Sequence, residues 1–94
     1  MSRRTWSGRQ ISKALPKKGF RKSQGDHHWY YLYVNGEKTN IRTKISHGNK
    51  DYTGDLWSCL RKQLKLSNDD LDNMLACHIG HDRYVEILVE NNHI

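Results

Sequence analysis

The Asn35-Gly36 pair constrains the fold of this 94-residue chain more than any other feature. Asn-Gly favours a two-residue type I′ turn, and the segments on both sides are rich in Val, Ile, Thr, Tyr and Trp, which suit a half-buried strand. Residues 25–47 are therefore predicted to form a β-hairpin.

The turn also sets the predicted register, because Val34 and Glu37 then face each other across it. One face of the hairpin carries the apolar residues Tyr30, Leu32, Val34, Ile41 and Ile45. Tyr30 is expected opposite Ile41, and His28 opposite Thr43. On the other face the expected pairs are Tyr33 with Lys38, Tyr31 with Asn40, Trp29 with Arg42, and His27 with Lys44.

This second face combines aromatic rings with cations. Rings offer stacking surfaces for bases, and Lys and Arg neutralise phosphates, so the combination is typical of a nucleic-acid interface. The alternative is a solvated sheet face on which the stems of Lys and Arg lie over aromatic rings. Sequence alone favours neither interpretation.

Charge is distributed unevenly along the chain. Residues 1–65 contain 15 of the 16 Lys and Arg and only four of the ten acidic residues, which indicates a polyanionic partner. Residues 66–94 contain the other six acidic residues and one Arg. That segment is either a solvated helix face or a surface that masks or imitates the polyanion site.

The segments around the hairpin are predicted to be mainly helical. Ser7 and Gln10 form a capping box that starts a first helix, and Pro16 should kink or end it before Gly19. Phe20–Gln24 is predicted to be a short strand. A second helix should bury Leu56, Leu60 and Leu64 together with Trp57 and Cys59. A third should start at Ser67 and bury Leu71, Met74 and Leu75, and a last one, after Gly80, should bury Tyr84, Ile87 and Leu88.

The predicted fold is therefore α+β: helix, three antiparallel strands, helix, then a C-terminal helical extension. Two helices must cover the apolar face of the sheet, because an uncovered face would expose apolar surface. The length indicates a single domain over residues 1–94, with a core at 5–67 and the extension at 68–94.

Composition argues against several other classes. Cys59 and Cys77 are too few for a disulfide scaffold, and no apolar run is long enough for a signal peptide or a membrane span, so a cytoplasmic protein is expected. Cys77, His78 and His81 lie close together in sequence, but structural zinc usually needs four ligands. No metal or cofactor is expected.

An ordered set of short motifs resembles the HicA toxin family. The set consists of Gly19-Phe20, Gly25-Asp26-His27-His28, the Asn-Gly hairpin, Ile45-Ser46-His47-Gly48 and Gln63-Leu64-Lys65-Leu66-Ser67. It covers roughly residues 5–67. The resemblance implies a double-stranded-RNA-binding-like α-β-β-β-α layer and a small ribonuclease that cleaves messenger RNA as the toxin of a type II toxin–antitoxin pair. It also implies an antitoxin protein as partner.

The family's catalytic histidine lies in a Gly-Ser-x-His pattern. Here Gly25 matches the glycine, Asp26 stands where serine is usual, and His28 matches the catalytic histidine. His47 matches a second histidine that commonly follows the third strand. The Pro often found before that histidine is absent.

Histidine suits acid–base cleavage of RNA because its ordinary pKa, about 6.5, makes both protonation states accessible near neutral pH. We expect His28 to be the acid–base residue, Asp26 to orient it, and His47 to act as complementary acid or phosphate ligand. The expected RNA contacts are Trp29, Tyr31, Lys38, Arg42, Lys44 and His27. The alternatives are a non-catalytic RNA-binding module and a protein-interaction module that uses the acidic helices.

Overall fold

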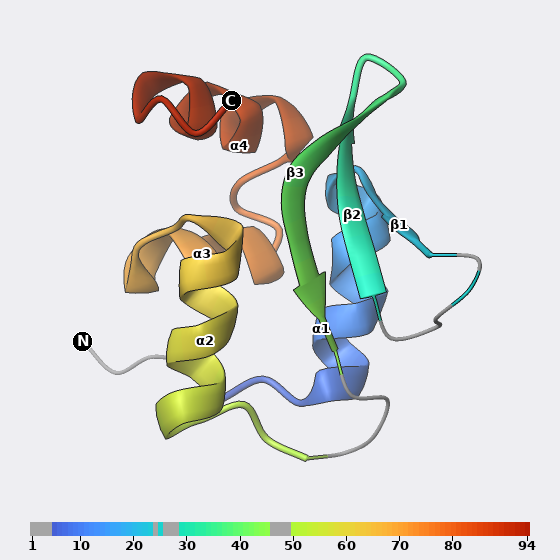
Figure 1. Ribbon diagram of the computed structural model, residues 1–94. Helices are drawn as coiled ribbons and strands as arrows, with labels where there is room; N and C mark the ends of the chain where they lie inside the picture. The colour runs from blue at the N-terminus through green and yellow to red at the C-terminus, as the bar shows by residue number, and fades with distance from the viewer. Residues whose placement is uncertain (1–4, 24, 26–28, 46–49) are drawn as a thin grey trace.

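The computed structural model describes residues 5–23, 25, 29–45 and 50–94. Its elements in chain order are α1 (Gly8–Ala14), the 3₁₀ helix η1 (Leu15–Lys18), β1 (Phe20–Lys22), β2 (Trp29–Val34), β3 (Glu37–Lys44), α2 (Gly54–Leu64), α3 (Asn68–Leu75) and α4 (His81–Glu90). The fold is α+β, with a three-stranded antiparallel sheet in the order β1-β2-β3. Helix α1 lies behind the sheet in the view of Figure 1, and α2 lies to one side of β3.

The first helix begins and ends where the sequence predicts. The Ser7 hydroxyl accepts a hydrogen bond from the backbone N–H of Gln10, and the Gln10 side chain accepts one from the N–H of Ser7, which completes the capping box. The α-helix ends at Ala14, and Pro16 lies in the 3₁₀ turn that follows. Gly19 ends that turn with φ +93°, a left-handed conformation that glycine adopts without strain.

The predicted hairpin register is correct next to the turn and wrong farther along. Val34 pairs with Glu37 and Tyr33 with Lys38, as expected. Beyond an irregularity between Tyr31 and Tyr33, the partners shift by two residues on β3, so the remaining pairs are Tyr31 with Arg42, Tyr30 with Thr43 and Trp29 with Lys44. Thr43 and Lys44, the partners expected for His28 and His27, are therefore opposite Tyr30 and Trp29.

The hydroxyl of Thr39 accounts for this bulge. It donates a hydrogen bond to the carbonyl oxygen of Leu32 at 2.8 Å and accepts one from the N–H of Ile41 at 3.2 Å. A side chain thus satisfies the backbone groups at the point where the ladder is interrupted. Because the shift is two residues, each side chain stays on its predicted face, and Ile41 and Thr43 are both buried.

One continuous core lies between the sheet and the helices. The sheet contributes Phe20, Tyr30, Leu32 and Ile41, and Ile45 follows directly after β3. Helices α1 and η1 contribute Ile11, Ala14 and Leu15. Helix α2 buries Trp57, Leu60 and Leu64, whereas Leu56 is 37% exposed and Cys59 is exposed. The expectation that Leu56 and Cys59 are core residues is wrong, because the buried stripe runs through Trp57 at three- and four-residue spacing.

The C-terminal helices share this core. Leu71, Met74 and Leu75 of α3 and Tyr84, Ile87 and Leu88 of α4 are buried at the positions predicted, and they belong to the same cluster as the sheet residues. The Tyr84 hydroxyl donates a hydrogen bond to the carbonyl oxygen of Leu64 at 2.9 Å, and the Trp6 indole donates one to Asp72 at 2.9 Å. Side chains far apart in sequence therefore hold α3 and α4 in place.

The helices in the described ranges are short, and α2, at 11 residues, is the longest of them. None of them is long and apolar enough to cross a membrane.

Candidate nucleic-acid interface

The side of the sheet opposite the core carries a row of aromatic rings with a cation beside each. Alternation along β2 places Trp29, Tyr31 and Tyr33 on this side, and each is half-buried. Arg21 of β1 and Lys38 and Arg42 of β3 are exposed beside them. We call these six residues the aromatic–cationic face.

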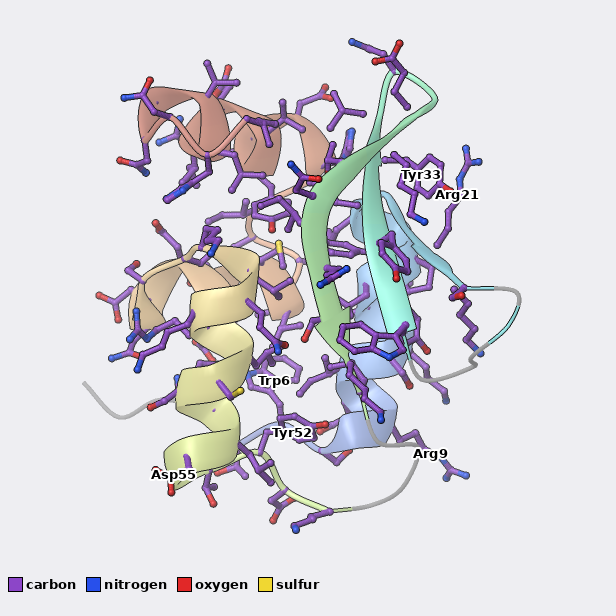
Figure 2. The ribbon with its side chains drawn as sticks, in the orientation of Figure 1. Trp6, Arg9, Arg21, Tyr33, Tyr52 and Asp55 are labelled. Carbon is purple, nitrogen blue, oxygen red and sulfur yellow. The ribbon has the colours of Figure 1, made fainter. Side chains whose placement is uncertain are left out.

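Each ring of this face has a cation within reach. The Lys38 ammonium lies 3.9 Å from the centroid of the Tyr31 ring, and the Arg21 guanidinium lies 4.4 Å from that of Tyr33. Figure 2 shows Arg21 of the edge strand β1 beside Tyr33 of the central strand β2. The Arg42 guanidinium lies 5.5 Å from the Trp29 ring. The face therefore repeats one flat ring and one positive charge, and a nucleotide presents the complementary pair, one base and one phosphate.

Two shallow hollows adjoin on this side of the molecule. The larger, about 450 Å³, is lined by Tyr31, Lys38, Thr39, Asn40 and Arg42. The smaller, about 290 Å³, is lined by Trp29, Asn40, Arg42, Gln63 and Lys65. Asn40 and Arg42 line both, so the surface continues from the sheet to the C-terminal end of α2.

The structure places five of the predicted RNA contacts on this side of the sheet. Tyr31, Lys38 and Arg42 line the larger hollow, and Trp29 lines the smaller. Lys44 is the cross-strand partner of Trp29. The remaining predicted site residues, Asp26, His27, His28 and His47, lie outside the described residues.

Four residues of this surface are absent from the sequence prediction. Arg21 comes from β1, where its alternation with buried Phe20 could have indicated an outward position. Asn40 is an outward position of β3 that was expected only as the partner of Tyr31. Gln63 and Lys65 reach the smaller hollow because of how α2 packs against β3, which no local pattern reveals.

Within the part of the chain that the structure describes, Cys77 and His78, between α3 and α4, and His81, the first residue of α4, are not grouped as a metal site. Among residues 5–23, 25, 29–45 and 50–94, no three or more His, Cys, Asp and Glu side chains are grouped to hold an ion. Cys77 and His78 are exposed, and Nδ1 of His81 lies 2.8 Å from the carbonyl oxygen of Lys18. Through this contact the His81 side chain holds the start of α4 against η1.

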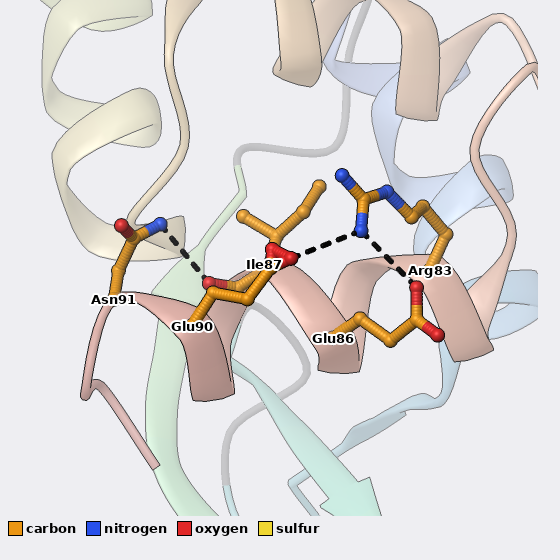
Figure 3. Close-up of polar contacts among 5 residues, drawn as sticks. All are labelled: Arg83, Glu86, Ile87, Glu90 and Asn91. Atoms are coloured by element: carbon orange, nitrogen blue, oxygen red, sulfur yellow. Dashed lines mark hydrogen bonds and ion pairs between the residues drawn. The ribbon is translucent and has the colours of Figure 1, made fainter.

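Part of the acidic C-terminal surface is neutralised within α4. The Arg83 guanidinium donates hydrogen bonds to Glu86 at 3.1 Å and to Glu90 at 3.3 Å (Figure 3). These bonds, that to Glu86 foremost, raise the pKa of Arg83. Asn91 donates to the carbonyl oxygen of Ile87 and closes the end of the helix. Two of the acidic side chains on α4 are therefore occupied by contacts within their own helix.

Comparisons with models of known protein families, with curated proteins and with solved structures found no match to this chain.

Proposed function

We propose that this protein binds single-stranded RNA across the aromatic–cationic face and cleaves it, as a small endoribonuclease of the HicA toxin type. The observation that carries the proposal is the set of three ring–cation contacts, at 3.9, 4.4 and 5.5 Å, on one side of one sheet. Stacking rings give affinity for bases of any sequence, and cations give affinity for phosphates.

The arrangement of elements supports the same interpretation. A helix, three antiparallel strands and a second helix follow one another in the order expected of a double-stranded-RNA-binding-like layer. The core lies on one side of the sheet, and the proposed RNA surface lies on the other. A toxin of this kind would act in the cytoplasm, where messenger RNA is translated, and an antitoxin protein would hold it inactive.

Cleavage is assigned to His28, with Asp26 and His47 as accessory residues. His28 immediately precedes Trp29, the first residue of β2, so RNA bound along β2 has the proposed acid–base residue at the next position of the chain. Imidazole can take the proton of a ribose 2′-hydroxyl or give one to the leaving oxygen, while Arg42 and Lys44 would stabilise the charge that develops on phosphate.

A test of cleavage compares His28→Ala with His78→Ala on a labelled single-stranded RNA. His78 is exposed between α3 and α4 and controls for the loss of an imidazole. We expect His28→Ala to lose cleavage and His78→Ala to keep it, with the same far-ultraviolet circular dichroism for both. If His28→Ala cleaves at the wild-type rate, the assignment of His28 is wrong.

A test of binding uses Tyr31, whose ring lies under the Lys38 ammonium. Removing a stacking ring costs about 1–3 kcal/mol per base, so Tyr31→Ala should bind single-stranded RNA about 5- to 150-fold more weakly. Tyr31→Phe keeps the ring and should bind nearly as well as the wild type. Equal affinities for the two variants would argue against stacking on this face.

The second candidate function is a non-catalytic RNA-binding module. The observation that favours it is that the described contacts suit binding by themselves, and Asp26 replaces the serine usual next to the family's catalytic histidine. Such a module would retard RNA in a gel and leave it intact. The wild-type lane of the cleavage assay therefore separates the two functions.

A further inference from the structure

The smaller hollow has the side chains of a pocket for a single nucleotide. Its lining residues supply an indole ring from Trp29, positive charges from Arg42 and Lys65, and side-chain amides from Asn40 and Gln63. At about 290 Å³ it is at the lower limit of small-ligand sites, about 300–1,000 Å³. That size suits one base and excludes a large cofactor.

Gln63 is held in a fixed orientation at the wall of this hollow. The Thr43 hydroxyl, whose residue is 0% exposed, donates a hydrogen bond to Oε1 of Gln63. The carbonyl end of the amide is thereby used within the protein. Within the described part of the chain, the amide NH₂ of Gln63 has no hydrogen-bond partner, so it is free to donate to a ligand.

The surrounding packing makes this orientation rigid. Gln63 lies in the last turn of α2, and its neighbours Leu60 and Leu64 are at most 2% exposed. Thr43 lies on β3 between buried Ile41 and Ile45. A donor fixed by two buried elements loses little conformational entropy on binding, which is the condition for selecting between ligands.

We infer that this hollow binds one nucleotide of the RNA and that Gln63 selects a base with a carbonyl oxygen on its edge. The base would stack on the Trp29 ring or the Arg42 guanidinium, and its phosphate would contact Arg42 or Lys65. The inference rests on the proposed binding of RNA, and it adds a specificity-determining residue that lies on a helix outside the sheet.

The chemistry of the bases tells which RNA to compare. Uracil presents carbonyl oxygens, which accept from an amide NH₂. Adenine has ring-nitrogen acceptors, but at the exocyclic position where uracil has a carbonyl oxygen it carries an amino group, which donates and so opposes the NH₂ of Gln63. Gln63→Glu replaces the NH₂ with an oxygen and keeps an oxygen for the Thr43 hydroxyl. The substitution therefore reverses the preferred partner without removing the contact that orients the side chain.

The test measures fluorescence anisotropy with 2′-O-methyl hexauridylate and 2′-O-methyl hexaadenylate, which lack the 2′-hydroxyl needed for cleavage through that group. We expect the wild type to bind the uridylate up to about tenfold more tightly, the effect of one net hydrogen bond. Gln63→Glu should reduce the ratio to about one or invert it, and the ratio cancels the effect of added negative charge on both ligands. Thr43→Val, which keeps the volume and removes the orienting hydroxyl, should also reduce it.

The possible outcomes separate this inference from the proposed function. A wild-type ratio of one, or a ratio that neither Gln63→Glu nor Thr43→Val changes, overturns the selection by Gln63 and leaves RNA binding by the sheet intact. Failure of the wild type to bind either oligonucleotide overturns both. A ratio that falls in both variants while urea denaturation shows each of them to be folded under the assay conditions supports the pocket.

Discussion

The imidazole of His81 lies directly against Gly19, so a Cβ atom added to this glycine would be 2.4 Å from Nδ1 of the ring. Nδ1 itself lies 2.8 Å from the carbonyl oxygen of Lys18. The first residue of α4 therefore packs on the backbone that leads into β1. This contact joins the C-terminal helix to the edge of the sheet.

Gly19→Ala should destabilise the protein more than Gly36→Ala. Both glycines have positive φ, +93° and +81°, but a Cβ at Gly36 meets nothing within 4 Å. The backbone strain costs about 1–2 kcal/mol in each variant, and the clash at Gly19 adds about 1–3 kcal/mol. Urea denaturation measures the difference, which His81→Ala should largely remove. Equal losses for the two glycines would contradict the close contact.

Thr39→Val should lower the free energy of unfolding by about 1–3 kcal/mol, because the Leu32 carbonyl loses its hydroxyl donor and the Ile41 N–H loses its acceptor. Thr53→Val is the matched control, since Thr53 is exposed and its side chain makes no capping hydrogen bond. Urea midpoints for the two variants check this prediction. A loss no greater at Thr39 than at Thr53 would show that the bulge does not depend on the hydroxyl.

Tyr84 should make the fold sensitive to alkali. Burial raises the pKa of Tyr84, whereas in the unfolded chain a tyrosine ionises at about pH 10. Below that pH the contribution of Tyr84 to stability is fully present. Above that pH the unfolded state releases a proton that the folded state retains, so the free energy of unfolding falls as pH rises. Tyr84→Phe has no proton to release there.

Two measurements of unfolding free energy test this role of Tyr84. At pH 7, Tyr84→Phe should be less stable by about 1 kcal/mol, because the Leu64 carbonyl loses its donor. The difference should narrow as pH rises above about 10, by up to about 1.4 kcal/mol for each pH unit. A difference that stays constant between pH 7 and 11 would rule out the effect.

Charge neutralisation on the aromatic–cationic face should appear in the salt dependence of RNA binding. Each phosphate contact with single-stranded RNA contributes about 0.7 to the slope of log affinity against log salt. Lys38→Gln and Arg42→Gln should each reduce that slope by about this amount. Lys13→Gln on α1, which lies behind the sheet, removes an exposed charge elsewhere and should leave the slope unchanged (Figure 1).

Local sequence signals predicted most of the architecture. The Asn35-Gly36 turn, the Ser7 capping box and the buried stripes of α3 and α4 depend on residues a few positions apart, and all were predicted correctly. The register beyond Tyr33 was wrong because it depends on one hydroxyl, that of Thr39, which replaces a ladder contact. A two-residue shift preserves the alternation of faces. The error therefore concerned the cross-strand partners and left each side chain on the face where it was predicted.

The residues of the candidate site likewise fall into those that a local pattern could predict and those that it could not. Trp29, Tyr31 and Arg42 could be assigned to one surface because alternation along a strand is a local property. Gln63 and Lys65 could not, because they reach that surface only through the packing of α2 against β3. The exposed position of Leu56 has the same origin, since the rotation of a helix is decided by the whole of its contact surface.

The complete burial of Tyr84 and Leu88 limits how this chain could be shortened. Deleting α3 and α4 would uncover Leu64 and Leu66, whose side chains are at most 5% exposed in the full structure. The shortened chain would therefore expose apolar side chains to solvent and would tend to self-associate. A fragment designed without α3 and α4 would need polar residues in place of the apolar ones that these two helices cover.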